Sequence, residues 1–415
     1  MQILTSLSSL GTTLEGLEAR QDASLVLPSA AEPLNALASR IPRNLSPSCI
    51  GEGKHDLRRG EAAIGRIPVV STDGTRLMPC KPAKARKLIR DGKAVKKWSK
   101  LSIFYIQLKF NPQNPSIQPI AVGVDPGSKF EGLSSVGTKD TVLNIMSEAV
   151  HWVKRIIQQR REMRRARRYR KTRCRPCRGD NRLRNQRNKM PPPSTKARWD
   201  AKLRIIRELA RTIPISTVVV EDIKAETRKG QRRWNENFSP LEVGKQYFYS
   251  ALRKKGLEVV FKSGRETEEL RTLHGLEKIA AKSKPVFESH CVDAWCLAAS
   301  VTGAQHPTTK SLHYLVPLRW HRRQLHKLQP SKGAVRRREG GTISLGLKKG
   351  TLVKHIKYGF CYIGGNMKEK LFSLHSLKTG RRITQRATRK DFEVLTKIAF
   401  RTQFLPPLKQ VGFLE

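Results

Sequence analysis

Acidic residues are scarce in this chain, and long apolar runs are missing from it. Its 415 residues include 34 Asp and Glu against 82 Lys and Arg, which gives a formal net charge of +48. No run of about 18 apolar residues occurs, and this excludes a membrane-spanning helix. The seven cysteines are mostly isolated, so they favour a reducing compartment over a disulfide framework.

The excess of positive charge predicts a polyanionic partner. A chain with this imbalance repels itself in isolation, and the spacing of its cations favours nucleic acid over a membrane. Residues 1–50 do not share in the excess, because they hold four acidic and three basic residues. Residues 1–61 are expected to be a disordered or poorly ordered extension. We expect the protein in the cytoplasm of a prokaryote, associated with the nucleoid, or in an equivalent reducing compartment.

A carboxylate at the end of an apolar strand is the first candidate for a catalytic group. Ile120-Ala-Val-Gly-Val-Asp125 is such a strand, and Pro126-Gly127 turns the chain directly after it. A rigidly held carboxylate suits Mg²⁺, which takes oxygen ligands and keeps several waters. Asp before Pro-Gly is also an ordinary way to begin a turn, so both interpretations stay open for these residues alone.

Two distant segments favour the metal-binding interpretation. Thr217–Ile223 is a β-branched run that ends in carboxylates, of which Glu221 is the candidate ligand. The segment from His290 onward is predicted to be a helix that stops at Gly303. His290 and Asp293 are three positions apart in that helix and therefore lie on one face.

Together these groups have the composition of a metal-dependent phosphodiesterase. Asp125, Glu221 and Asp293 would hold two Mg²⁺ ions, for which Mn²⁺ can substitute, and the ions would activate a water and stabilise the leaving oxygen. His290 would position that water or protonate the leaving group. The alternatives are capped strand ends, a polar helix N-terminus and a buried structural histidine.

The segment from Lys154 to Lys189 is dominated by arginine. A helix over 152–173 would be about 30 Å long, and we expect cations on every face of it and phosphate on several sides. The alternative is that this run is solvated or disordered. The run lies between the segments that carry Asp125 and Glu221, however, and this position favours a nucleic-acid contact. Cys174 and Cys177 have the spacing of half a zinc site, although no second close pair follows. The predicted nucleic-acid-binding residues of this segment are Arg160, Arg161, Arg164, Arg165, Arg167, Arg168, Arg170, Lys171 and Arg173.

Two smaller basic units flank these motifs. Residues 66–110 are predicted to form a strand, a turn at Gly74–Pro79, a basic helix over 82–92 and a second strand over 103–110. That helix presents Lys84, Arg86 and Lys87 as further candidates for nucleic-acid binding. Beyond Gly303 the chain carries basic clusters, including Arg322 and Arg323, and Gly-punctuated apolar runs over 341–380. These runs predict a small antiparallel β-barrel or sheet with basic loops.

These motifs resemble a known family, the transposon-encoded RNA-guided IscB/IsrB proteins. Arg76–Arg86 resembles their N-terminal PLMP domain, with Arg where the family has Pro. Val122–Lys129, Val219–Asp222 and His290–Asp293 resemble their first, second and third RuvC motifs, and the arginine-rich segment resembles their bridge helix. The basic tail is similar to their C-terminal domain, which contacts guide RNA and the target-adjacent motif. The resemblance covers roughly residues 62–390 in the same order.

One departure from IscB narrows the resemblance to IsrB. IscB carries an HNH nuclease between its second and third RuvC motifs. Between Glu221 and His290 this chain has one other histidine, His274, and no cysteine, so an HNH site is not expected. The resemblance therefore implies a guide-RNA-dependent nickase whose RuvC site cuts the displaced, non-target DNA strand.

The predicted fold is an α/β protein with a RuvC/RNase H-like mixed sheet that is interrupted by the arginine-rich bridge helix. The predicted partners are an omega-type guide RNA and a double-stranded DNA target with an adjacent motif, in a ribonucleoprotein that contains one copy of the chain, with no membrane. The alternatives are a guide-independent RuvC-type nuclease acting on branched DNA and a non-enzymatic RNA-binding protein. The predicted units are the extension at 1–61, a PLMP-like domain at 62–112, RuvC segment I at 119–150, the bridge helix at 151–190, RuvC segments II and III at 195–312 and the C-terminal domain at 313–415.

Overall fold

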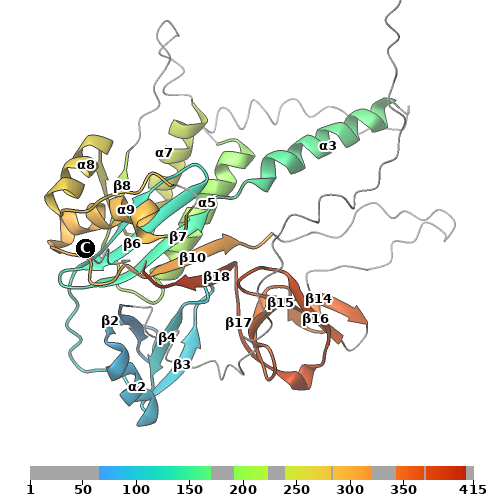
Figure 1. The fold of residues 1–415 in the computed structure, drawn as a ribbon, viewed down its shortest axis with the longest axis horizontal. Coiled ribbons are helices and arrows are strands. Elements are labelled where there is room, and N and C mark those ends of the chain that lie inside the picture. The colour runs from blue at the N-terminus through green and yellow to red at the C-terminus, as the bar shows by residue number, and fades with distance from the viewer. Residues whose placement is uncertain are drawn as a thin grey trace, which may run out of the picture. The chain divides into compact units, whose positions relative to one another are not determined.

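The computed structural model describes residues 65–169, 191–222, 239–281, 284–319, 343–368 and 371–407. Figure 1 shows their helices and strands. Several predictions lie outside these residues: the extension at 1–61, the cysteine pair, and the candidate residues Arg170, Lys171, Arg173, Arg322 and Arg323.

A small four-stranded sheet comes first in the described chain. Its order is β2-β1-β4-β3, and helix α2 packs on it through the buried Ala85. The segment predicted to be a turn at Gly74–Pro79 contains β2 instead, which pairs antiparallel with β1. The bounds are β1 Ile67–Val70, β2 Arg76–Cys80, α2 Pro82–Arg90, β3 Ala94–Trp98 and β4 Phe104–Leu108.

The central sheet has seven strands in the order β18-β10-β7-β6-β5-β8-β9. Within it β6 is antiparallel to both β5 and β7, whereas β8 and β9 run parallel to β5. If β5 to β9 are numbered 1 to 5 along the chain, their order across the sheet is 3-2-1-4-5, and strand 2 (β6) runs antiparallel to its neighbours. This is the RNase H-like arrangement that the sequence predicted. The bounds are β5 Ile120–Asp125, β6 Phe130–Gly137, β7 Thr141–Glu148, β8 Thr217–Glu221 and β9 Glu258–Lys262.

Helices cover both faces of the central sheet. Alternate residues of β5 and β8 divide between the faces, because successive side chains of a strand point to opposite sides. Val122 and Val220 pack with Ile206 of α5 and Phe248 of α7, while Ala121 and Val219 pack with α9. The bounds are α5 Pro193–Leu209, α7 Pro240–Arg253, α8 Gly264–Leu273 and α9 Phe287–Thr302.

Local signals set the ends of these helices. Ser239 caps α7 by accepting a hydrogen bond from the Glu242 backbone N–H at 3.1 Å. Ser263 and Glu266 form a capping box at the start of α8, which satisfies two of the free N–H groups there. Gly303 ends α9 in the left-handed conformation with φ of 75°, as the predicted helix stop required.

The C-terminal part of the described chain forms a five-stranded antiparallel sheet. Its order is β16-β15-β14-β13-β17, which agrees with the antiparallel strands predicted from the Gly-punctuated runs. The bounds are β13 Thr351–His355, β14 Gly359–Lys368, β15 Leu371–Ser376, β16 Arg382–Ala387 and β17 Phe392–Lys397. Before them, β11 (Ile343–Ser344) and β12 (Leu347–Lys348) form a separate two-stranded antiparallel sheet.

Two strands from the predicted C-terminal domain lie in the central sheet instead. β10 (Leu312–Pro317) pairs parallel with β7, and β18 (Phe400–Leu405) pairs antiparallel with β10. The chain therefore leaves the central sheet after β10, builds the five-stranded sheet and returns as β18. Both ends of the C-terminal sheet are thus joined to the central sheet.

The arginine-rich helix α3 spans Trp152–Tyr169. Arg160, Arg161, Arg164 and Arg165 are all exposed, as predicted. At 100° per residue these four positions fall within an arc of about 140°, and exposed Arg155 lies about 80° beyond that arc. The expectation of cations on every face of a helix over 152–173 stays a prediction. None of the described helices is both long enough and apolar enough to cross a membrane.

His313 is a buried polar residue in the middle of β10. It is 5% exposed, its ring lies 5.1 Å from that of Phe404, and neither ring nitrogen has a hydrogen-bond partner among the described residues. Burial lowers the pKa of His313 to about 4, because the charged imidazolium loses its hydration there.

We therefore expect His313 to make the fold sensitive to acid. Its folded pKa lies below its unfolded value, so the unfolded state takes up the proton first and stability falls as the pH drops below 6.5 towards 4. Between pH 7 and pH 5 the loss should be about 2 kcal/mol, and His313→Leu should remove that part of the pH dependence. Urea unfolding of both proteins at the two pH values measures it, with His306→Leu at an exposed position as the control. An equal pH dependence in wild type and His313→Leu would contradict the assignment.

Candidate active site

Two of the predicted carboxylates end adjacent parallel strands. Asp125 is the last residue of β5 and Glu221 the last of β8, and Val124 lies opposite Val220 in the register of the pair. Both carboxylates follow the alternation that places Ala121 and Val219 against α9. Parallel strands of matched register thus bring Asp125 and Glu221 to one edge and one face of the sheet.

The third carboxylate arrives on α9, which lies directly on this face. A Cβ atom at Gly123 of β5 would be 1.8 Å from the Ala294 carbonyl oxygen, and one at Gly132 of β6 would be 1.8 Å from that of His290. Glycine is therefore required at both positions for the helix backbone to touch the strands. The contact holds the first turns of α9, and with them His290 and Asp293, against β5 and β6. One ammonium, that of Lys278, therefore reaches both Asp293 and Asp125.

Two cations hold Asp293 in place. Arg271 of α8 donates a hydrogen bond to Asp293 Oδ1 at 3.0 Å, and Lys278 Nζ binds the other carboxylate oxygen. The same Lys278 ammonium lies 3.9 Å from Asp125 Oδ2, and its charge also acts on Glu221. Lys278 is thus a positive charge at the point where the three carboxylates converge.

The pKa values of Asp125 and Glu221 are raised because these carboxylates are buried close to other acids. Burial raises the pKa of Asp125; Lys278 opposes the rise and Asp293 adds to it. Burial also raises the pKa of Glu221 to about 7, and the charges of Asp125 and Asp293 contribute. Glu221 in its protonated form donates a hydrogen bond to Asp125. Like charges this close disfavour full ionisation unless a cation compensates them.

The donor set fits Mg²⁺ in its chemistry. Three carboxylates supply the oxygen ligands that a hard divalent cation takes. The Lys278 ammonium occupies the position between Asp125 and Asp293 that a metal ion would take. In the arrangement described, no group of three or more His, Cys, Asp or Glu residues has the spacing of a metal site. A metal ion would therefore have to take over the position that the Lys278 ammonium holds.

Asp222, the neighbour of Glu221, faces away from these acids. Its Oδ1 accepts hydrogen bonds from Lys245 Nζ at 2.8 Å and from the Tyr249 hydroxyl at 3.0 Å, both on α7. This division agrees with the choice of Glu221 over Asp222 as the candidate ligand, since adjacent strand residues point to opposite faces.

His290 lies in the first turn of α9 and is 8% exposed. Its ring is 5.5 Å from that of Phe130, and its charge acts on Asp125 to lower that carboxyl's pKa. His274 is a different case, because its Nδ1 lies 2.9 Å from the Gln305 carbonyl oxygen and its ring packs edge-on against Trp295. The structure therefore brings His290 to the acids and gives His274 a place in the packing of α8 and α9.

A buried ion pair lies beneath this edge and was not predicted from the sequence. Lys202 of α5 donates a hydrogen bond to Glu131 Oε1 of β6 at 2.6 Å, and the side chains are 4% and 1% exposed. Removing one partner of such a pair costs about 3–5 kcal/mol, because the other charge is left buried. The pair fixes α5 to the sheet from the face opposite α9.

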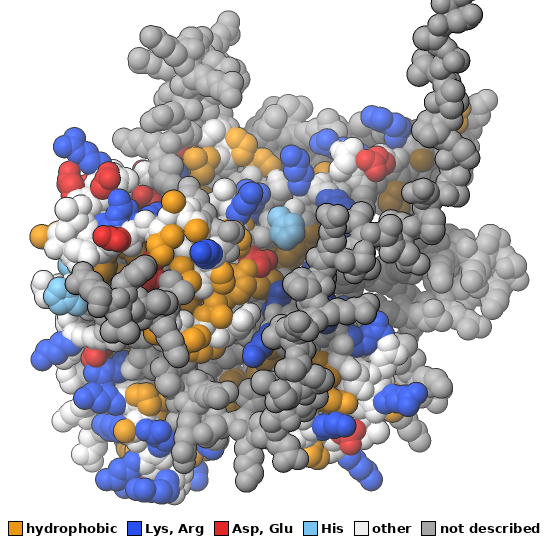
Figure 2. Space-filling view, viewed as in Figure 1, with side chains coloured by type: hydrophobic (Ala, Val, Ile, Leu, Met, Phe, Trp, Pro, Cys, Tyr) orange, Lys and Arg blue, Asp and Glu red, His pale blue; other side chains and the backbone are white. Residues whose placement is uncertain are grey.

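The predicted nucleic-acid-binding residues of α2 lie away from the acids. Lys84, Arg86 and Lys87 are exposed on this helix, and Figure 2 shows Lys and Arg side chains gathered over it, at the lower left of the picture.

Four residues that shape the site were not predicted from the sequence: Arg271, Lys278 and the two contact glycines, Gly123 and Gly132. An isolated glycine inside a strand is a known signal for close backbone approach, so Gly123 and Gly132 could have been found, whereas nothing in the sequence marks Lys278.

Comparison with known proteins gives one family and a set of solved structures. A family described as RRXRR protein matches residues 67–237, and the chain has Arg-Arg-Ala-Arg-Arg at 164–168. No curated protein matches this sequence. Two structures of Thermus thermophilus RuvC, one in complex with a Holliday junction substrate, are each 14% identical with a TM-score of 0.25. The match with the complex covers 43% of this chain and 90% of the RuvC chain. The match with the other structure covers 45% of this chain and 97% of the RuvC chain.

The contact between α9 and β6 can be tested at Gly132. Gly132→Ala forces a methyl group against the His290 carbonyl, so the helix must shift and carry His290 and Asp293 with it. We expect a loss of about 1–3 kcal/mol of stability from overpacking. Thermal unfolding measures this, and Gly137→Ala is the matched control in the same strand, because its Cβ would meet ordinary contacts at 3.6 Å and beyond. Equal stability of the two variants would mean that α9 does not depend on this glycine.

Proposed function

We propose that this chain is a RuvC-type, RNA-guided DNA endonuclease that nicks the displaced DNA strand by metal-dependent hydrolysis of a phosphodiester. The observation that carries the proposal is the convergence of Asp125, Glu221 and Asp293 around one point that a cation occupies. The three acids come from two strand ends and a helix that are far apart in the sequence. A structural role for them would not require their charges to face one another.

In this proposal Asp125, Glu221 and Asp293 hold Mg²⁺, and two ions are expected. Bound metal would supply an activated water and charge stabilisation at the leaving oxygen. His290 would orient the attacking water or give a proton to the leaving oxygen, since its ring lies beside the acids on the first turn of α9. Arg271 would keep the Asp293 carboxylate in position when Lys278 moves away from it.

The rest of the chain offers surfaces for nucleic acid. Four exposed arginines on one side of α3 fit a row of backbone phosphates, and the RRXRR match supports a role for this helix. We propose that the four-stranded sheet with α2 is a PLMP-like domain, that α3 is the bridge helix, and that the five-stranded sheet with its basic loops contacts the guide RNA and a target-adjacent motif.

A guide would supply the sequence recognition that the protein itself lacks. Effectors of this kind leave recognition to base pairing with the guide, while the protein contacts backbone shape and a short adjacent motif. The described elements between Glu221 and the start of α9 are α7, β9 and α8; β9 is an edge strand of the central sheet, and the two helices pack on that sheet. One proposed nuclease site would cut one strand at a time.

The first test removes the carboxylates one at a time. Asp125→Asn, Glu221→Gln and Asp293→Asn should each lower the cleavage rate at least about 100-fold, the effect of losing about 3 kcal/mol of metal-derived stabilisation. Binding of nucleic acid should remain close to wild type. Single-turnover cleavage and filter binding measure the two effects.

Glu288→Gln is the matched control for these variants. Glu288 is on the same helix and pairs with Lys310 at 3.7 Å, so its change removes a carboxylate without touching the three acids. Retained cleavage in two of the three acid variants would overturn the nuclease assignment and favour a non-enzymatic RNA-binding protein.

The second test concerns the product. The chain, supplied with Mg²⁺ and with the RNA that co-purifies with it, should convert a supercoiled target to the nicked circle and not to the linear form. Supercoiling should speed the reaction, because exchange of DNA duplex for RNA–DNA hybrid is nearly balanced in energy. Gel separation of the plasmid forms and strand-specific end-labelling measure it.

Two results would contradict this expectation. Cuts in both strands in one binding event would mean that one site reaches both strands or that a second site exists. Cleavage of branched DNA at the same rate without RNA would favour a guide-independent nuclease.

A further inference from the structure

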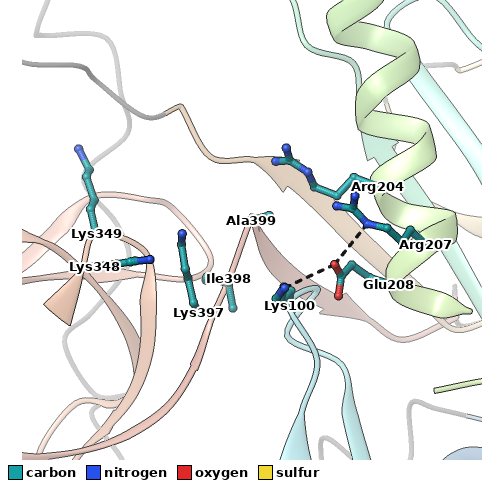
Figure 3. Close-up of a pocket in the computed structure, with 9 residues that line it drawn as sticks. All are labelled: Lys100, Arg204, Arg207, Glu208, Lys348, Lys349, Lys397, Ile398 and Ala399. Carbon is teal, nitrogen blue, oxygen red and sulfur yellow. Dashed lines mark ion pairs between the residues drawn. The ribbon is translucent and has the colours of Figure 1, made fainter. Parts of the chain in front are cut away.

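A basic pocket lies at the C-terminal end of α5, where three parts of the chain meet (Figure 3). It has a volume of about 410 Å³ and six cationic side chains around a single carboxylate, that of Glu208. The cations are Lys100 from the β3–β4 turn, Arg204 and Arg207 from α5, Lys348 at the end of β12 and Lys349 directly after it, and Lys397 at the end of β17.

Main-chain hydrogen bonds hold the walls of this pocket. The Ala399 N–H donates to the Lys100 carbonyl at 3.0 Å, and the Ile398 N–H donates to that of Gly350 at 2.8 Å. The Ala399 carbonyl in turn accepts from the Leu318 N–H at 3.0 Å. The turn between β17 and β18 is therefore tied to the β3–β4 turn, to the residue before β13 and to the residue after β10.

The single carboxylate leaves most of the positive charge uncompensated. Glu208 is 3% exposed and pairs with Lys100 at 3.9 Å, Arg207 at 3.8 Å and Arg211 at 3.4 Å. No carboxylate in the described chain forms an ion pair with Arg204, Lys348 or Lys349. Burial lowers the pKa of Lys349, and burial followed by the charges of Lys348, Lys100 and Arg204 lowers that of Lys397.

The positive charge continues beyond the pocket. Arg207 also lines a second cavity, of about 550 Å³, together with Arg76, Arg211, Lys254 and Lys255. The two cavities share Arg207 in their walls, and their ten cationic side chains are called the basic track. A track of this kind fits a chain of several phosphates better than one free phosphate ion.

The basic track lies far from the proposed catalytic acids. Arg204 and Arg207 lie near the end of α5, which leads into the first residue of β8, whereas Glu221 is the last. Those two ends of β8 are about 13 Å apart, and α5 lies on the sheet face opposite α9. A phosphate in the track is therefore not the one that the acids would cleave.

We propose that the basic track, centred on the Lys100–Arg204–Lys397 pocket, binds the phosphodiester backbone of the guide RNA and holds it apart from the DNA strand that is cut. This inference rests on the proposed function for the identity of the RNA, but the phosphate chemistry of the track does not depend on it. Each cation would contact a phosphate oxygen, and Glu208 orients Lys100 and Arg207.

Acetylation of lysines in the purified complex tests the proposal. The full chain, isolated with its bound nucleic acid, is labelled before and after treatment with ribonuclease, and separately after deoxyribonuclease. Mass spectrometry should show Lys348, Lys349 and Lys397 labelled several-fold more after ribonuclease and unchanged after deoxyribonuclease. Exposed Lys139 should be labelled equally throughout.

Unchanged labelling of the three lysines after the RNA has been removed would overturn the proposal. A gain after deoxyribonuclease alone would assign the track to DNA and overturn it too. Protection of the track by RNA in a preparation that does not cleave DNA would sustain this inference while the proposed nuclease activity fails.

A triple variant gives an independent measure. Arg204→Gln, Lys348→Gln and Lys397→Gln together should reduce the slope of log affinity for RNA against log salt by about 2, at ~0.7 for each phosphate contact. The control removes the same charge at three exposed sites outside the track and outside the five-stranded sheet, with Lys139→Gln, Arg265→Gln and Lys310→Gln. An equal change of slope in both triple variants would show that net charge alone is responsible and would refute a specific site.

Discussion

The direct contact between helix α9 and strands β5 and β6 is the constraint on which the candidate site depends. With no side chain at Gly123 and Gly132, the carbonyl groups of Ala294 and His290 reach the strands. This contact fixes the distance of the helix from the sheet, and so it determines where Asp293 lies relative to Asp125. The buried Lys202–Glu131 pair holds α5 against the other face. The sheet is thus fixed from both sides at the edge where the acids meet.

Charges of opposite sign are kept apart in this fold. Three carboxylates gather on the α9 face, where Lys278 and Arg271 compensate them. The basic track gathers ten cations on the α5 face with one buried carboxylate among them. Because both groups are pinned by packing, neither can reach the other for neutralisation. The proposed function depends on this separation, because a divalent cation would bind among the acids while phosphates would bind along the basic track.

Local pattern predicted many of the elements but could not place all of them. The β-branched run of β8, the helix stop at Gly303 and the arginine-rich helix all carry strong short-range signals, and each element lies where it was expected. Gly74–Pro79 was predicted to be a turn because of its glycine and proline, but pairing with β1 makes Arg76–Cys80 a strand. β10 and β18 were assigned to the C-terminal part, and only their pairing with β7 and with each other puts them in the central sheet.

The sequence alone determined the type of chemistry available to this protein: its positive charge, the acids at strand ends, and the spacing of His290 and Asp293. These are local properties, because composition and residue spacing do not depend on how distant segments meet. Only the tertiary structure decided that Glu221 faces the acids while Asp222 faces Lys245, that Lys278 lies among the carboxylates, and that Lys100, Arg204 and Lys397 share a pocket. Each of these depends on contacts between segments tens to hundreds of residues apart, and the packing of the whole chain sets such contacts.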